Sequence, residues 1–293
     1  MSGRRAAEGA IMQGKLCVIT GATSGIGLVA SERLAAMGAR LLLVARDKAR
    51  GEAAFARIQA KAPGAALRII YGDLSRLAEM NRLGAEIAQM EPRIDVLINN
   101  AGAMFAERGT TADGLERTFA TNHMAYFVLS NRLKPSLVAA SGARIVNTAS
   151  AAHHRAVHGL DFDDLQAERS YHYFTVYGRS KLANILFTRE LARRLDGSGI
   201  TANCLHPGFV STRFGDNNRG IFRLGIGIAK LFAISPEKGA ETIVYLASSP
   251  DVAHVTGEYF AECRPARLSA AAQDDAAARR LWEESARIAK LPA

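Results

Sequence analysis

A tyrosine and a lysine stand one helical turn apart in the stretch YGRSKLANILF, residues 177–187. Of the seven tyrosines in the chain, only Tyr177 has a lysine four residues later, Lys181. On a helix these two side chains share a face. A cation there stabilises the phenolate and lowers the pKa of the tyrosine toward the range where a general acid or base works. The pair predicts proton transfer at a substrate oxygen, although the same spacing also occurs in plain surface pairs.

A glycine-rich loop, TGATSGIG, spans residues 20–27. It follows an apolar strand pattern and opens a helix pattern, which is the context that a dinucleotide-binding loop requires. Gly21 allows the tight turn, while Gly25 and Gly27 let the backbone approach a pyrophosphate, which would meet free N–H groups at the start of the helix. A purely structural glycine turn is the alternative. The remaining cofactor contacts of the loop are expected from Thr23, Ser24 and Ile26.

The end of the second strand pattern indicates which dinucleotide is bound. In the run LLLVARD, Ala45 stands where NAD sites place an acid for the ribose 2′-hydroxyl, and Arg46 follows. A guanidinium matches a 2′-phosphate in charge and in donor geometry. Asp47 is expected to cap the next helix. The sequence therefore predicts NADP(H) rather than NAD(H) as the cofactor.

Apolar runs that predict strands alternate with helix patterns along the chain. The runs are nearly continuous in Val, Ile and Leu, which is typical of parallel strands covered on both faces. They predict one α/β domain with a Rossmann-type, doubly wound parallel sheet of about seven strands and helices on both faces. The strand runs are 15–20, 40–45, 67–72, 94–99, 143–149, 200–206 and 257–261. Helix patterns include 113–138, 173–195, 236–248 and 273–289.

The NAD(P)-binding domain is expected to occupy residues 14–293, after an N-terminal tail at 1–13. The tail shows no apolar stretch that suits a signal peptide or a transmembrane anchor, so we expect a soluble, cytoplasmic protein. The apolar segment 209–235 is predicted to be a lid over the substrate site. Contact with a membrane surface is the alternative for it, because Arg223 and Lys230 lie among its apolar residues.

The net charge of +9 permits nucleic-acid, membrane or phosphate partners. The basic residues are scattered among acidic ones and no nucleic-acid-binding motif is present, so we expect no nucleic-acid partner. Three cysteines are too few for a disulfide framework. The histidines at 153, 154 and 158 have no carboxylate or cysteine at a supporting spacing, so no metal site is predicted.

Five motifs occur together in the order that is typical of the short-chain dehydrogenase/reductase family, which the chain resembles. They are TGATSGIG at 20–27, NNAG at 99–102, Ser150 after the fifth strand, the Tyr177–Lys181 pair, and HPG at 206–208. Further stretches resemble the retinol dehydrogenase-like branch, and the likeness covers nearly the whole chain. They include TNHMAYFVLS at 121–130, SAAHH at 150–154 and TGEYFAECRP at 256–265.

The resemblance implies a catalytic set of Asn122, Ser150, Tyr177 and Lys181. Tyr177 would exchange the proton and Ser150 would hydrogen-bond the substrate oxygen. Lys181 would hold the nicotinamide ribose, and Asn122 would order a water near it. Ser150 and Tyr177 are 27 residues apart, which is longer than in many members of the family. Ser170 is the alternative serine, but it lies outside the predicted strand end.

The resemblance also implies further contacts with the dinucleotide. Asp73, after the third strand, would accept a hydrogen bond from the adenine amino group, with Leu74 next to it. The adenosine side would be lined through the backbone by Asn99, Ala101 and Gly102. The chain would bend past the nicotinamide at Pro207 and Gly208, with Val210 and Thr212 near its carboxamide. Tyr177 and Lys181 complete the set of cofactor contacts.

The predicted function is an NADP(H)-dependent oxidoreductase that interconverts a carbonyl and an alcohol on a lipophilic small molecule. The main alternative is a catalytically silent, dinucleotide-binding regulatory protein, but the complete catalytic set argues against it. A sugar-nucleotide epimerase or dehydratase also uses a Tyr–Lys pair, yet it has a different glycine spacing and a longer C-terminal part. The family resemblance implies a homodimer or homotetramer, paired through the helices at 113–138 and 173–195.

Overall fold

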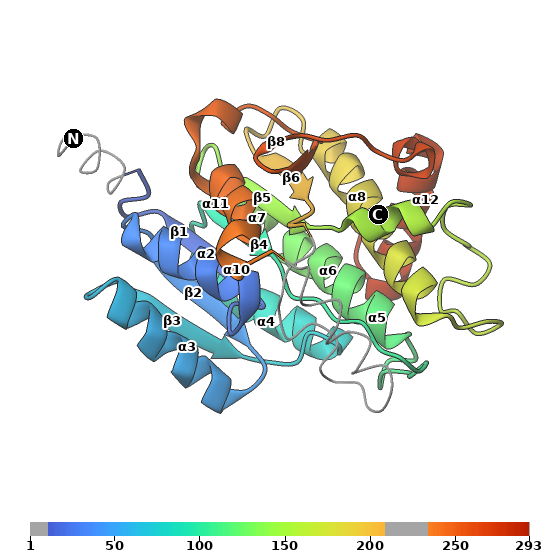
Figure 1. Ribbon diagram of the computed structural model, residues 1–293, viewed down its shortest axis with the longest axis horizontal. Helices are drawn as coiled ribbons and strands as arrows, with labels where there is room; N and C mark the ends of the chain where they lie inside the picture. The colour runs from blue at the N-terminus through green and yellow to red at the C-terminus, as the bar shows by residue number, and fades with distance from the viewer. Residues whose placement is uncertain (1–10, 209–233, 293) are drawn as a thin grey trace.

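The computed structural model of the protein describes residues 11–208 and 234–292. Its centre is an eight-stranded sheet with helices packed on both faces (Figure 1). The strands lie in the spatial order β3-β2-β1-β4-β5-β6-β7-β8. Their bounds are Leu16–Thr20 (β1), Arg40–Ala45 (β2), Leu67–Tyr71 (β3), Val96–Asn99 (β4), Arg144–Thr148 (β5), Thr201–Leu205 (β6), Tyr259–Ala261 (β7) and Arg264–Pro265 (β8).

Neighbouring strands from β3 to β7 are parallel, while β7 and β8 are antiparallel. The predicted doubly wound parallel sheet is therefore confirmed, and the structure adds β8 to the seven strands expected. β8 has two residues, one of them Pro265. So short a strand gives no apolar run that a sequence pattern can reveal, and proline is confined to sheet edges because it lacks an N–H donor.

The register of the sheet brings the carboxyl ends of its strands to one edge. Thr20 of β1 pairs with Val44, just before the end of β2, and Ala45 pairs with Tyr71 at the end of β3. On the other side of β1, Asn99 at the end of β4 pairs with Asn147 of β5. The loops that follow these strands leave the sheet together. The strand order reverses between β1 and β4, and ligands of open α/β sheets bind at such a switch point.

The helices form two layers, one on each face of the sheet (Figure 1). One layer contains α2 (Gly25–Ala36), α3 (Lys48–Lys61), α10 (Pro236–Gly239) and α11 (Glu241–Ser248). The other contains α4 (Leu77–Met90), α6 (Ala125–Arg132), α8 (Tyr173–Arg194) and α12 (Asp275–Ala289). Shorter elements are α5 (Arg117–Phe119), the π-helical turn η1 (Ala120–Met124), α7 (Lys134–Val138), and the 3₁₀ turns η2 (Ala151–Arg155), η4 (Pro250–Val252) and η5 (Ala270–Gln273).

Strand β1 shows why the apolar runs are continuous. Its side chains alternate between the two helix layers. Leu16 and Val18 belong to the core shared with α4, α6 and α8, whereas Cys17 and Ile19 belong to the core shared with α2 and α3. Each of the four is at most 2 % exposed. Both faces of the strand are covered, so an apolar residue is favourable at every position.

The single helix predicted at 113–138 is wrong in its detail, because the structure divides this region. The Glu116 carboxylate accepts hydrogen bonds from the backbone N–H groups of Thr118 and Phe119, each at 2.7 Å, and so begins α5. The π-helical turn η1 follows, and then α6. The backbone hydrogen bonds of a π turn span one residue more than those of an α-helix, and such turns are frequent at functional sites. Apolar spacing alone does not reveal so local an insertion.

The packed structure begins within the predicted tail. Met12 is fully buried, and its backbone N–H donates to the carbonyl of Met37 at 3.1 Å. Residues 1–10 lie outside the described part of the chain. The predicted lid at 209–235 falls almost wholly on residues 209–233, which are also outside it, as are the predicted cofactor contacts Val210 and Thr212.

Helix α12 covers part of α8. The indole of Trp282 stacks on the ring of Phe187, with centroids 5.9 Å apart. The Asp275 carboxylate accepts hydrogen bonds from Arg189 and Arg193, each at 2.9 Å. We expected α8 to pair with a second subunit, and this part of its surface is covered within the chain. The homodimer or homotetramer stays a prediction.

Candidate active site

Tyr177 and Ser150 are brought together across the long segment that separates them. Ser150 follows β5 and begins η2, where its Oγ accepts a hydrogen bond from the Ala152 N–H at 3.1 Å. Burial raises the pKa of Tyr177 to about 12, and a side-chain hydrogen bond with Ser150 offsets part of that rise. The serine that contacts Tyr177 is therefore Ser150 and not the alternative, Ser170.

The prediction that Lys181 lowers the pKa of Tyr177 is wrong for this structure, because burial dominates at both groups. Lys181 is 3 % exposed, and burial lowers its pKa to about 7. Its Nζ donates a hydrogen bond to the carbonyl of Thr148 at 2.9 Å and lies 5.7 Å from the centroid of the Tyr177 ring. Tyr177 consequently holds its proton at neutral pH and is prepared to act as a donor.

Asn122 lies in the π-helical turn and is fully buried. Its Oδ1 accepts a hydrogen bond from the Ala103 N–H at 2.7 Å, and its Nδ2 donates to the Ala103 carbonyl and to Ser180 Oγ, each at 2.9 Å. A methyl group placed on Gly102 would lie 3.3 Å from Asn122 Oδ1 and 3.5 Å from Lys181 Nζ. Asn122 and Lys181 therefore face one small space beside Gly102, which is exposed.

The glycine loop is held by two residues that the sequence analysis did not assign, Asn100 and Thr20. Asn100 Nδ2 donates hydrogen bonds to the carbonyls of Thr20 and Gly21 at 3.3 and 3.2 Å. Thr20 Oγ1 accepts from the backbone N–H groups of Asn100 and Ala101 at 2.9 and 3.0 Å. A Cβ on Gly27 would collide with the Asn100 amide and the Gly21 carbonyl, so this contact requires glycine. Asn100 is the second asparagine of NNAG, so this motif was the sequence feature that could have indicated its role in holding the glycine loop.

The start of α2 fits the phosphates of a dinucleotide. Ser24 occupies the N-cap position, but its side chain makes no cap hydrogen bond, and no acidic residue lies in the first turn. The first N–H groups of a helix have no partner within it, and the helix dipole there favours negative charge. An anion that approaches this end therefore meets donors from the backbone of Gly25, Ile26 and Gly27 without competition from a carboxylate.

Arg46 and Asp73 lie at the same edge of the sheet, after β2 and β3. Arg46 is exposed. Asp47 caps α3, as predicted, because its Oδ1 accepts from the Arg50 N–H at 2.8 Å. Asp73 Oδ1 accepts from the Ser75 N–H at 3.0 Å, and Leu74 beside it is buried. Asp47 therefore serves as the cap of α3, and the contact of Arg46 with a 2′-phosphate stays a prediction.

Asn99, predicted on the adenosine side, is the last residue of β4, and Pro207 and Gly208, predicted on the nicotinamide side, follow β6. The side chain of Asn99 is fully buried, and its Nδ2 donates to Asn147 Oδ1 at 2.9 Å and to Ser130 Oγ at 3.1 Å. The Gly208 N–H donates to His206 Nδ1 at 3.1 Å. The side chain of Asn99 therefore ties β4 to β5, and its contact with the cofactor through the backbone stays a prediction.

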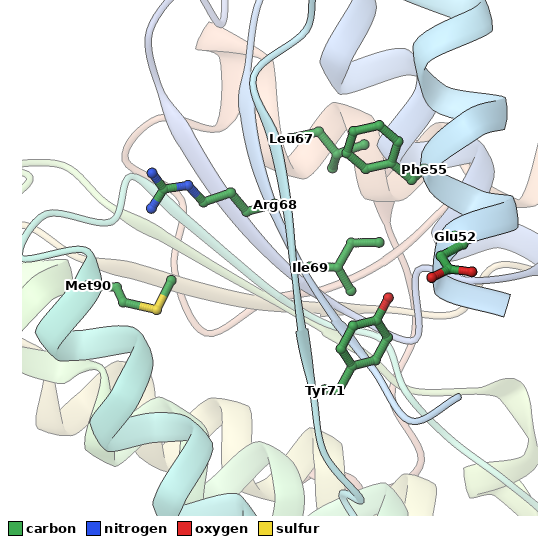
Figure 2. Close-up of a pocket in the computed structure, with 7 residues that line it drawn as sticks. All are labelled: Glu52, Phe55, Leu67, Arg68, Ile69, Tyr71 and Met90. Carbon is green, nitrogen blue, oxygen red and sulfur yellow. The ribbon is translucent and has the colours of Figure 1, made fainter. Parts of the chain in front are cut away.

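Two other features lie outside this group. In the described part of the chain, no three His, Cys, Asp or Glu side chains are placed to hold a metal ion. A shallow hollow at the edge strand β3 contains none of the predicted site residues. Figure 2 shows Arg68 and Met90 on one side of that strand and Phe55 and Glu52 on the other. The hollow is lined by Glu52, Phe55, Leu67, Arg68, Ile69, Tyr71 and Met90.

A glycine loop at the switch point of a doubly wound sheet, with Ser150, Tyr177 and Lys181 beyond it, defines the class of dinucleotide-binding oxidoreductases. A family model described as short chain dehydrogenase matches residues 15–162 and 165–220. The chain belongs to the short-chain dehydrogenase/reductase family. Members of this family bind a nicotinamide dinucleotide.

Within the family, the chain is retinol dehydrogenase-like. It is 40% identical to retinol dehydrogenase 14 of Homo sapiens, over 96% of this chain and 88% of that protein. It is 39% identical to human retinol dehydrogenase 13, over 97% and 87% of the two chains. Among solved structures, an uncharacterised protein from Mycobacterium paratuberculosis is 30% identical with a TM-score of 0.77, and 98% of both chains is covered.

A second solved structure carries a cofactor. It is a short chain dehydrogenase from Burkholderia cenocepacia in complex with NADP, 26% identical with a TM-score of 0.66, and the match covers 85% of this chain and 96% of that one.

Among the described residues of the present protein, no helix combines the length and the apolar character needed to cross a membrane.

Proposed function

We propose that the protein is an NADP(H)-dependent oxidoreductase that interconverts a ketone or aldehyde with its alcohol on a lipophilic small molecule. The nicotinamide supplies or accepts the hydride when it is bound. The preference for a lipophilic substrate is supported by the names of the relatives, retinol dehydrogenases 13 and 14.

The observation that carries the proposal is the pairing of Ser150 with Tyr177. Ser150 Oγ accepts the Ala152 N–H, so its own hydrogen is available for a second partner. A substrate oxygen beside Tyr177 would receive hydrogen bonds from both hydroxyl groups. Two donors directed at one oxygen stabilise the negative charge that develops there when a carbonyl is reduced.

The protonation state of Tyr177 favours reduction of a carbonyl. Burial raises the pKa of Tyr177 to about 12, so the phenol keeps the proton that the reduced oxygen needs. Burial also lowers the pKa of Lys181 to about 7, so its charge changes near neutral pH. Lys181 Nζ is anchored by the Thr148 carbonyl and faces the space beside Gly102, where we propose that it holds the nicotinamide ribose.

A panel of aldehydes, ketones and alcohols, assayed with NADPH and with NADH, tests the function. We expect oxidation of NADPH with apolar aldehydes or ketones, followed as loss of absorbance of the reduced nicotinamide. Cofactor binding is measured on the same protein by fluorescence titration. Tight NADPH binding without turnover of any panel member would contradict the enzyme and favour a regulatory protein.

Arg46→Asp is expected to reverse the cofactor preference. A charge-assisted contact with the 2′-phosphate contributes about 1.5–3 kcal/mol, so its loss raises the KM for NADPH by about 10- to 100-fold. The new carboxylate repels the 2′-phosphate and can accept the ribose hydroxyls of NADH, whose KM should fall. Steady-state kinetics with both cofactors measure the two changes.

Arg279→Asp is the matched control for that variant. Arg279 lies on the exposed side of α12, so this change alters the net charge equally without a change near β2. An unchanged KM for NADPH in Arg46→Asp, or an equal rise in Arg279→Asp, would exclude Arg46 as the reader of the 2′-phosphate.

A further inference from the structure

His153 is a fully buried histidine directly behind Ser150 that the catalytic group does not include. Its Nδ1 lies 2.8 Å from the Ser150 carbonyl oxygen, and its Nε2 lies 3.4 Å from the backbone nitrogen of Ser269. A carbonyl only accepts and an amide N–H only donates. Nδ1 must therefore carry the hydrogen and Nε2 must accept, so the surroundings select one neutral tautomer.

Rings on two sides also fix the imidazole. Tyr259 of β7 makes an edge contact with it, with centroids 5.2 Å apart, and His154 lies 4.0 Å away between centroids. Burial lowers the pKa of His153 to about 4, and the neighbouring His154 and His206 act in the same direction. The ring is neutral at physiological pH, which is the state that both hydrogen bonds need.

The Ser150 carbonyl is held by His153 twice. It accepts from the His153 backbone N–H at 3.1 Å as well as from Nδ1. These bonds fix the plane of the peptide that follows Ser150, at the start of η2. The hydroxyl of Ser150 is fixed from the same turn by the Ala152 N–H. The direction in which the hydroxyl points therefore depends on the conformation of this one turn.

The turn packs directly on α8 next to Tyr177. A Cβ on Gly178 would lie 2.7 Å from the Ala152 carbonyl oxygen and 3.2 Å from Arg155 Cβ. Backbone meets backbone here, so a shift of η2 changes the position of Ser150 relative to the neighbouring Tyr177. The two segments are packed too closely for either to move without displacing the other.

We propose that His153 is a positioning residue for the Ser150 hydroxyl, and that through Ser269 it makes the segment after β8 part of the active-site scaffold. The inference rests on the proposed function for the role of Ser150. Ser269 begins η5, and its own Oγ accepts the Ala272 N–H at 3.3 Å. A segment more than a hundred residues further along the chain thereby reaches the peptide that orients Ser150.

A series at position 153 tests the role of the ring. His153→Phe keeps an aromatic ring but removes both hydrogen bonds, and we expect kcat to fall about 3- to 10-fold with an unchanged Kd for NADPH. His153→Asn restores a donor toward the Ser150 carbonyl and should recover part of kcat. His254→Phe is the control, because His254 is exposed and lies between η4 and β7, outside this turn. Equal kcat values in wild type and His153→Phe, or a loss that Asn does not reduce, would overturn the proposal.

A pair at position 269 tests the connection to the C-terminal segment. The φ of Ser269 is −66°, the value that proline imposes, so Ser269→Pro removes the N–H without forcing φ. Ser269→Ala keeps the N–H and removes only the hydroxyl. We expect a lower kcat in the proline variant than in the alanine variant. Equal values would show that the Ser269 N–H plays no part.

Hydrogen exchange followed by mass spectrometry gives a readout that needs no turnover. His153→Phe should speed exchange in the segments 150–156 and 266–273, whereas His254→Phe should not. If wild type turns over no substrate, the proposed function fails and this exchange result still decides the inference. Unchanged exchange in both segments would overturn the inference and leave the proposed function intact.

Discussion

Tyr177→Phe is expected to abolish most turnover and to leave NADPH binding intact. The variant loses one oxygen, which is the group that holds the proton for transfer and the partner of Ser150. General acid–base catalysis contributes about 10²–10⁴-fold, so kcat should fall by a factor in that range. The ring remains, so the packing beside Lys181 is kept. Stopped assays with NADPH and the best carbonyl of the panel measure kcat, and fluorescence titration measures the Kd for NADPH.

Tyr245→Phe is the matched control for this variant. Tyr245 lies on α11, on the opposite face of the sheet, where its ring packs 6.4 Å from that of Phe260. It loses the same atom in a place without contact with the site, so we expect wild-type kinetics. Retained activity in Tyr177→Phe would contradict the proposed proton transfer, and a loss of NADPH binding would show that the hydroxyl serves the cofactor instead.

Lys181→Met is expected to lower kcat and to weaken cofactor binding together. Methionine fills a similar volume but brings neither charge nor donors to the space beside Gly102. Loss of a positioned charge in a water-poor site costs about 10²–10³-fold in kcat. The Kd for NADPH should rise as well, because the ribose loses a partner, which distinguishes this variant from Tyr177→Phe. Lys238→Met, at an exposed position on α10, is the control.

The same variant should change the dependence of stability on pH. Burial lowers the pKa of Lys181 from 10.5 in its ordinary state to about 7 in the fold. Between those two pH values the unfolded chain binds a proton that the folded chain does not. The buried amine therefore destabilises the fold fully below pH 7, and this cost disappears as the pH rises toward 10.5.

Lys181→Met removes that cost. We expect a free energy of unfolding above that of wild type at pH 6.5, by on the order of 1–3 kcal/mol, and an advantage that shrinks at pH 10. The Thr148 carbonyl keeps a partner, because Asn184 Nδ2 also donates to it at 3.3 Å. Urea unfolding at both pH values measures the difference. The same difference at both would contradict a depressed pKa for Lys181.

The sheet and the glycine loop could be predicted from the sequence because both leave a local pattern. A strand buried on two faces must be apolar at nearly every position, as β1 is, and the loop needs small residues at fixed offsets. The cap at Asp47 is equally local, since its acceptor reaches a backbone N–H three residues away. Such features depend on the residues within one turn or one strand.

The remaining features depend on groups that are distant in sequence. Asn100 acts through the carbonyls of a loop almost eighty residues earlier, so its neighbours in the chain do not indicate its role. The pKa of Tyr177 is set by burial, which a Tyr–Lys spacing does not reveal. The same holds for His153, whose partner Ser269 follows it by 116 residues. These contacts exist only after the sheet has brought the loops together.

Because of the π-helical turn at Ala120–Met124, the number of residues between α5 and α6 matters more than which residues they are. In an α-helix each residue advances the chain by about 100° around the axis. Removing one residue from the turn would rotate everything before it by that angle relative to α6. Asn122 could then no longer meet Ala103 and Ser180 while Glu116 kept its bonds to the start of α5. Substitutions in Ala120–Met124 leave the rotation of the two helix segments about their axis unchanged. We therefore expect the deletion of one residue here to disturb the site more than several substitutions do.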